Sequence, residues 1–179
     1  AENPTLFASI LEHKNQYIAI PKVSSQNRRY IPMDYLNGEI IPGDKLFTMP
    51  DASLYEFGIL MSNVHMAWTR AVCGRLKSDY SYSNTIVYNN FPWPSPTEEQ
   101  QRKIENTAQA ILDARALYPN SNLAALYDPL TMPTELRRAH TLNDKAVMAA
   151  YGFSTKMTEA TCVTELLNLY QRMLQEKEK

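Results

Sequence analysis

The sequence of 179 residues has few cysteines, few glycines and no long apolar run. Its two cysteines stand far apart without a paired neighbour, which argues against a disulfide-stapled secreted scaffold and against a zinc ribbon. No apolar stretch approaches the roughly 20 residues that span a bilayer, and the first residues have neither the basic nor the apolar region of a signal peptide. We therefore expect a cytoplasmic protein with no membrane partner.

The chain also lacks the motifs by which common enzyme domains bind cofactors and metals. Its five glycines never form Gly-x-Gly, which excludes the cofactor-cradling loop of a Rossmann-like domain. No Pro-Pro pair occurs, which excludes the Asn/Asp-Pro-Pro-aromatic loop with which adenine-N6 methyltransferases hold an extruded base. The nearest approach to a Mg²⁺ site, Glu12-His13-Lys14, has no neighbouring aspartate. We expect no catalytic residue and no cofactor or metal site in this stretch of chain.

Proline is concentrated at one place, where the character of the sequence changes. Three prolines fall within five residues of the segment 89–96, which we expect to be an ordered strut with its two large aromatic side chains packed inward. The sequence predicts an α+β chain: a small mixed α/β domain over residues 1–95, followed by an α-helical C-terminal domain over residues 96–179.

In the first half, alternation of apolar residues predicts strands at 16–22, 29–32, 45–48 and 85–88. Between the last two strands, the apolar period changes to three and four residues over 53–76. This predicts an amphipathic helix, or two helices broken near Ser62-Asn63, with Trp68 in the core and Gly74 as the stop.

The second half has helical spacing almost throughout. A capping-box pattern at Thr97 and Gln100 opens a predicted helix over 97–117. A second helix is predicted between Pro133 and Gly152, with a bend near Asn143-Asp144, and a third from Thr158 toward the C-terminus.

Charge is balanced over the whole chain but uneven along it. The 18 Lys+Arg and 19 Asp+Glu give a formal net charge of -1, which taken alone argues against a nucleic-acid partner. The first half has 8 basic and 8 acidic residues, yet seven of these basic residues lie in two acid-free windows, 13–33 and 57–78. Hydroxyl, amide and aromatic side chains border both windows, an inventory that suits contact with a DNA duplex. Two solvated loops are the simpler alternative.

Several individual residues have simple structural interpretations. His65 and His140 are expected on a helix surface or as hydrogen-bonded core histidines. At least one of Tyr80 and Tyr82 is expected to face the core, with contact to DNA as the alternative. The adjacent arginines at 137–138 are expected to be solvated, with phosphate contact as the alternative.

A series of segments carries a resemblance to a known family. They are Ile20–Ser25, Arg28–Pro32, Phe57–Leu60, His65–Trp68, Cys73–Tyr80, Val87–Pro94, Leu126–Leu130, Met132-Pro133, Leu136–His140 and Ala146–Gly152. In order and spacing they resemble the target-recognition region and helical tail of MmeI-like, type IIL restriction-modification enzymes. The string Tyr-Asn-Asn-Phe-Pro-Trp-Pro is the most specific part. Ser81 is a departure, because the resemblance leads us to expect a basic residue there.

The resemblance implies a division of labour. In that family one polypeptide carries an N-terminal nuclease, a helical spacer, an S-adenosylmethionine-dependent adenine-N6 DNA methyltransferase, a recognition region and a helical tail. This chain would be the last two parts, a non-catalytic fragment of a bacterial defence enzyme. Its partners would be double-stranded DNA and the upstream methyltransferase domain. The parent would use S-adenosylmethionine, and Mg²⁺ if a nuclease domain is present. The alternative is a helical protein-interaction module with incidental basic loops.

In this interpretation residues 1–95 lie against the duplex while the upstream domain extrudes and methylates an adenine. The candidates for contact with DNA are the polar and basic residues of the two windows and their borders: Ser24, Ser25, Asn27, Arg28, Arg29, Arg70, Arg75, Lys77, Ser78, Tyr80, Ser83 and Asn84.

Overall fold

The computed structural model describes residue 13 and residues 15–177. Its elements are β1 (Tyr17–Pro21), β2 (Val23–Ser24), β3 (Asp34–Leu36), β4 (Leu46–Pro50), α1 (Leu54–Leu60), α2 (Asn63–Val72), β5 (Gly74–Leu76), β6 (Asp79–Ser81), the π-helical turn η1 (Asn84–Tyr88), α3 (Glu98–Ala116), α4 (Leu123–Leu126), α5 (Thr134–Ala150) and α6 (Glu159–Lys177). Strands and two helices come first and longer helices follow, so the predicted α+β class is confirmed.

The strands form two small antiparallel sheets, with the orders β3-β1-β4 and β2-β6-β5. In the first sheet, β1 pairs with β4 from Tyr17↔Pro50 to Pro21↔Leu46. The first and third of the predicted strands are therefore confirmed. Only one residue separates β1 from β2, yet β2 leaves the first sheet and pairs with β6 of the second. The chain thereby connects the two sheets directly.

Two of the predicted strands are wrong. Segment 29–32 is irregular because its proline has no N–H to donate to a sheet, and β3 begins only at Asp34. Segment 85–88 lies in η1, where the Ile86 N–H donates to the Ser83 side-chain oxygen at 3.3 Å and caps the turn. An apolar run of four residues fits one helical turn as well as it fits a strand.

The apolar stripe over 53–76 folds, as far as Val72, as two helices that meet at an elbow, which is one of the two arrangements predicted. Ser53 caps α1 in a capping box, and the Ser62 hydroxyl accepts the His65 N–H at 3.2 Å to begin α2. Because Ser62 has the extended backbone of an N-cap residue, α1 cannot continue through it and ends before it. Trp68 is 2% exposed and belongs to the core, which confirms its predicted place.

The long helices of the second half correspond to the three predicted ones. Thr97 and Gln100 form the predicted capping box of α3. Helix α5 runs without interruption, so the bend predicted at Asn143-Asp144 is wrong. Both side chains are buried: Asp144 accepts the Asn63 N–H at the α1–α2 elbow, and Asn143 donates to the Gly58 carbonyl of α1. Gly74 is not the helix stop predicted for it, because it begins β5.

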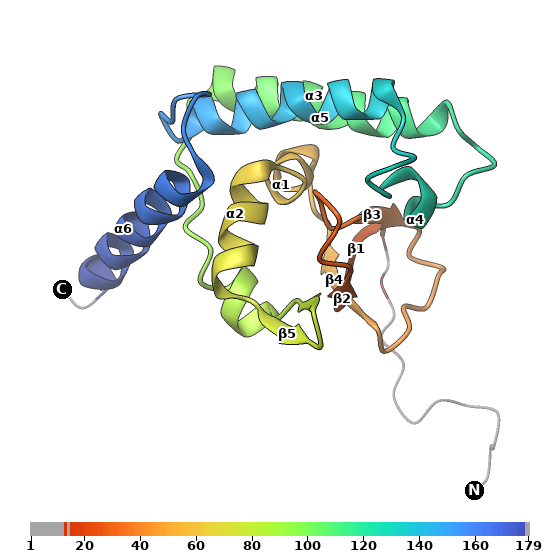
Figure 1. Ribbon diagram of the computed structural model, residues 1–179, viewed down its shortest axis with the longest axis horizontal. Coiled ribbons are helices and arrows are strands. Elements are labelled where there is room, and N and C mark those ends of the chain that lie inside the picture. Colours follow the sequence, from red (N-terminus) through yellow and green to blue (C-terminus); the bar gives the residue numbers. More distant parts are fainter. Residues whose placement is uncertain (1–12, 14, 178–179) are drawn as a thin grey trace, which may run out of the picture.

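The two halves of the sequence share one hydrophobic core. Helices α3 and α5 lie side by side along one edge of the molecule, and α1 and α2 pack beneath them beside the small sheets (Figure 1). Helix α6 diverges from α3 and α5 and packs against α2. Helices α1 and α3 approach each other closely at Gly58 of α1, where a Cβ atom would lie 2.6 Å from the Ile104 side chain and 3.2 Å from that of Ala108. The helical half therefore completes the core of the first half.

The segment 89–96 is an ordered strut, as predicted. Phe91 is 1% exposed, and its ring meets the ring of His65 edge-on at 5.0 Å and that of Trp93 at 5.5 Å. The Tyr151 hydroxyl donates to the Pro92 carbonyl at 2.8 Å, which ties the strut to the end of α5. The connection between the two halves is thus part of the core.

Candidate nucleic-acid interface

The two acid-free windows meet in the sheet β2-β6-β5. Strand β2 belongs to the first window and β5 to the second, and both pair with β6. Ser24 lies opposite Tyr80 on one side of β6, and Arg75 lies opposite the same Tyr80 on the other side. This pairing places the turn that follows β2 beside the β5–β6 hairpin. Basic residues from two distant segments of the sequence are brought together in this way.

A tight turn over residues 25–28 forms the first part of this surface. The Arg28 N–H donates to the Ser25 carbonyl at 3.1 Å, and the Asn27 N–H donates to the Ser25 hydroxyl at 3.3 Å. Gln26 and Asn27 are left at the tip of the turn, and both are exposed.

The hairpin fixes this turn by its backbone. The Gln26 N–H donates to Asp79 Oδ1 at 3.2 Å, and the Tyr80 hydroxyl donates to the Gln26 carbonyl at 3.2 Å. Both backbone groups of one tip residue are therefore held by adjacent residues of β6. A turn held in this way presents its side chains in a defined direction.

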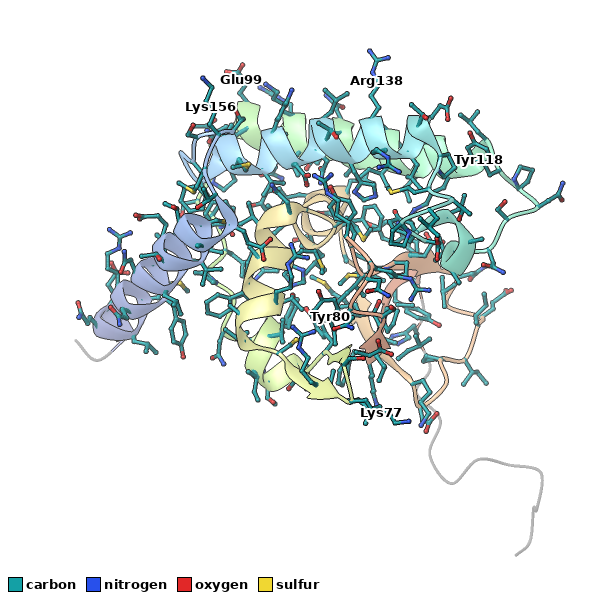
Figure 2. All side chains as sticks on the ribbon, in the orientation of Figure 1. Lys77, Tyr80, Glu99, Tyr118, Arg138 and Lys156 are labelled. Atoms are coloured by element: carbon teal, nitrogen blue, oxygen red, sulfur yellow. The ribbon has the colours of Figure 1, made fainter. Side chains whose placement is uncertain are left out.

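The β5–β6 hairpin is the second part of the surface. Lys77 and Ser78 join the strands, and Lys77 has φ 56°, in the left-handed region that tight hairpin turns require. The Arg75 guanidinium lies 4.3 Å from the centre of the Tyr80 ring and donates to the Ser78 carbonyl at 3.3 Å. Lys77 reaches the edge of the molecule, whereas Tyr80 lies inside it (Figure 2).

Three cations of this surface stand without an acidic partner. Among the described residues, no carboxylate forms an ion pair with Arg28, Arg75 or Lys77. The nearby carboxylate of Asp79 accepts the Gln26 N–H. The turn and the hairpin, which we call the turn–hairpin surface (residues 24–28 and 75–80), therefore concentrate positive charge.

Two of the predicted cations are used differently. Arg29 lies 3.4 Å from the buried carboxylate of Asp144, although its own side chain is 58% exposed. Arg70 donates two hydrogen bonds to Glu159, at 2.7 and 2.9 Å, and so joins the end of α2 to the start of α6. A bidentate pair of this kind holds two elements in register.

The remaining candidates differ in exposure. Ser24 and Tyr80 are 2% and 4% exposed, so their side chains support the turn–hairpin surface from within. Tyr82 is also buried, which confirms that at least one of the two tyrosines faces the core. Ser83 caps η1 and Asn84 begins it, so neither belongs to the turn or the hairpin. Ser81 is half-exposed on β6.

Asp144 of α5 was not foreseen from the sequence, yet it anchors both the first window and the elbow. One carboxylate oxygen accepts the Asn63 N–H at 2.7 Å, at the start of α2, and the other accepts the Tyr30 hydroxyl at 2.7 Å. Burial raises the pKa of the Asp144 carboxyl. Its neighbour Asn143 donates to the Gly58 carbonyl at 2.7 Å. The signal was present: these polar residues interrupt the apolar stripe of a helix.

Arg115 of α3 makes the corresponding contact at the other end of the core. It is 7% exposed and donates to the Met33 carbonyl at 2.9 Å and to Asp34 at 3.2 Å, just before and within β3. Its Nε also donates to the Tyr127 hydroxyl at 2.9 Å, which lies 2.8 Å from His140 Nε2. Buried polar groups of α3 and α5 thus hold the backbone of the first half.

His65 and His140 are buried core histidines, one of the two possibilities predicted. Burial lowers the pKa of His65 to about 4, and burial together with the charge of Arg115 lowers the pKa of His140 to about 3. His65 meets the Leu60 carbonyl and the Tyr82 hydroxyl, both at 3.0 Å. Both rings are neutral near pH 7, and both nitrogens of each ring make hydrogen bonds within the core.

The described residues show neither a metal site nor a membrane-spanning helix. Within residues 13 and 15–177, no group of three His, Cys, Asp or Glu side chains is arranged to hold a metal ion. Glu12 and Lys14, considered above as part of a Mg²⁺ site, lie outside the described residues. None of the described helices is both long and apolar enough to cross a membrane.

Comparison with known proteins places this arrangement in a family. Residues 1–95 match the family described as "MmeI, target recognition domain", and residues 96–177 match "MmeI, C-terminal domain". DNA methyltransferase A of Bacillus subtilis (strain 168) is 41% identical over 173 residues, which are 97% of this chain and 20% of that protein.

A solved structure is similar over the same extent. It is that of the type IIL restriction-modification enzyme MmeI in complex with DNA; the two chains are 44% identical, with a TM-score of 0.92. The match covers 97% of this chain and 23% of that one, so this chain spans about a fifth to a quarter of the length of these relatives. On these matches, the chain belongs to the MmeI family and comprises its target recognition and C-terminal domains.

Proposed function

We propose that this chain selects the DNA sequence for a larger restriction-modification enzyme, whose methyltransferase domain lies on the same polypeptide. The observation that carries the proposal is the turn–hairpin surface. It gathers Arg28, Arg75 and Lys77, without acidic partners among the described residues, around a turn whose backbone is fixed. The DNA-bound MmeI structure, to which this chain is similar, supports a duplex as the partner.

The candidate residues take different parts in this proposal. The three unpaired cations neutralise phosphates, and the exposed hydroxyl and amide groups of the surface contact phosphates or base edges. Buried Ser24 and Tyr80 position the turn. The exposed part of Arg29 is within reach of phosphate, whereas Arg70 is engaged with Glu159 and contributes chiefly to structure.

The two halves also differ in role. Residues 1–95 lie against the duplex, and residues 96–179 brace them through Asp144, Arg115 and Glu159. The upstream domain extrudes an adenine from the duplex and methylates its N6. The methyl donor, S-adenosylmethionine, and any Mg²⁺ of a nuclease are bound by that upstream part, so this chain performs recognition and no chemistry.

The cysteines favour a reducing compartment for this enzyme. Cys73 and Cys162 are both free thiols, and burial raises the pKa of each, which keeps them protonated and unreactive near pH 7. We therefore place the enzyme in the bacterial cytoplasm, where it would act on DNA.

Mapping of methylated bases tests the proposal. The full-length protein, incubated with S-adenosylmethionine and genomic DNA, is expected to methylate adenine N6 within one sequence motif, read by single-molecule sequencing. The double variant Arg28→Ala/Lys77→Ala should methylate the same motif more slowly at limiting enzyme, because phosphate contacts strengthen binding without specifying bases. Arg102→Ala/Lys103→Ala, which removes two exposed charges of α3, is the control. Absence of methylation, or an unchanged rate in the double variant, would contradict the proposal.

A further inference from the structure

The tip of the turn carries two adjacent carboxamides, Gln26 and Asn27, and Gln26 was not among the residues that the sequence singled out. Its side chain is exposed, and it forms no hydrogen bond with another described residue. A free carboxamide presents one donor and one acceptor in the same plane. This is the pattern that pairs with N6 and N7 of adenine in the major groove.

Gln26 differs from Asn27, the neighbouring exposed amide of the surface, in that its backbone is held by the β5–β6 hairpin. Asp79 accepts its N–H and the Tyr80 hydroxyl donates to its carbonyl, both at 3.2 Å. Tyr80 is itself held, since it is 4% exposed, is paired with Ser24 across the sheet and lies under the Arg75 guanidinium. The backbone of Gln26 is therefore held in place by a buried residue, which lowers the entropic cost of presenting the Gln26 side chain to a ligand.

The surroundings of Gln26 favour nucleic acid as that ligand. Arg28 lies two residues along the same turn, and Lys77 forms the tip of the hairpin whose next strand holds Gln26. A protein that recognises bases needs cations beside the recognising side chain, because contacts to phosphate set the register of the protein on the duplex. Arg28 and Lys77, which have no acidic partner among the described residues, are placed to make such contacts beside Gln26.

Resting on the function proposed above, we propose that Gln26 reads an adenine of the target sequence by a bidentate contact to N6 and N7, and that Asp79 is its positioning residue. The adenine is a recognition base in the major groove, distinct from the base that is methylated. The carboxylate of Asp79 acts through the Gln26 backbone, whose N–H it accepts.

The test is selection of bound sequences from a randomised duplex library by the full-length protein. Gln26→Glu replaces the amide donor by an acceptor and should move the preference at one position from adenine to cytosine, whose N4 amine donates. Gln26→Ala should lose the adenine preference at that same position by roughly tenfold or more. Gln171→Glu, with the same chemical change on the exposed face of α6, should alter no position.

The positioning role of Asp79 has its own readout. Asp79→Ala should weaken the preference at the position read by Gln26, whereas Asp79→Asn, which keeps an acceptor oxygen, should retain most of it. Relaxation at a different position would overturn the positioning role. An unchanged preference in Gln26→Glu and Gln26→Ala would overturn the inference while leaving the proposed function intact. If the unaltered protein selects no sequence at all, the proposed function itself fails.

Discussion

Asp144 is the residue in which the two halves of the chain depend on each other most directly. It is 4% exposed, lies in the helical half, and accepts hydrogen bonds from Asn63, Tyr30 and Arg29 of the first half. A buried carboxylate is costly unless its oxygens are satisfied, and here each oxygen has a partner. The same contact holds Arg29 and Tyr30, which directly follow the turn at 25–28.

Replacement of Asp144 by alanine should therefore destabilise the protein strongly. The variant leaves the Tyr30 hydroxyl and the Asn63 N–H without partners in the core, for an expected loss of about 2–4 kcal/mol in the free energy of unfolding. Asp113→Ala, which removes an exposed carboxylate of α3, should change it by less than about 0.5 kcal/mol. Denaturant unfolding of both variants measures the difference. A stability of Asp144→Ala within 0.5 kcal/mol of the unaltered protein would contradict this role.

At the scale of elements, the sequence predicts those helices and strands whose ends are determined by neighbouring side chains. Helix starts are marked by side chains that cap them, so Thr97 and Ser62 locate α3 and the elbow. The short strands β2, β5 and β6 were missed because two or three residues show no period, and because each is stabilised by partners distant in sequence. The segment 85–88 was misread for a different reason, because an apolar run of four residues fits one helical turn as well as it fits a strand.

The candidate site was predicted only in part, for a related reason. Acid-free windows are visible in the sequence, and they contain Arg28, Arg75 and Lys77. Which cations are already paired depends on tertiary contacts, so Arg70 could not be separated from the others before the structure placed Glu159 beside it. Gln26 was missed because its significance lies in the backbone contacts from Asp79, which is distant in sequence.

The packing of α1 against α3 and α5 gives a prediction at the same scale. In Gly58→Ala the new methyl group would lie 2.6 Å from the Ile104 side chain and 3.1 Å from Asn143 Oδ1. We expect a loss of about 1–3 kcal/mol in stability, although alanine is the better helix former by up to about 1 kcal/mol.

Gly43→Ala is the matched control for this variant. No atom lies within 4 Å of the position of its Cβ, so it should be neutral or slightly stabilising. Thermal unfolding of both variants checks the comparison. An increase in the melting temperature of Gly58→Ala would show that α1 and α3 do not approach as closely as described.

On the scale of the whole molecule, a net charge of -1 conceals a surface with three cations and one carboxylate, that of Asp79. The turn–hairpin surface joins the two windows through β6, while ion pairs with α5 and α6 divert Arg29 and Arg70 toward the helical half. Positive charge is thus placed where a duplex is proposed to lie and neutralised where the two halves meet. A reader of this kind has few phosphate contacts and depends on the rest of the enzyme for affinity.

Two charge-matched triple variants test this arrangement most directly. Arg28→Ala/Arg75→Ala/Lys77→Ala and Arg102→Ala/Lys103→Ala/Lys145→Ala each remove three positive charges, the second from exposed residues of α3 and α5. The affinity of the full-length protein for a duplex is measured against salt concentration. The first variant should lower the slope of log K against log salt by about 2 to 3, and the second should leave it nearly unchanged. Equal slopes for the two variants would contradict a DNA-binding role for the turn–hairpin surface.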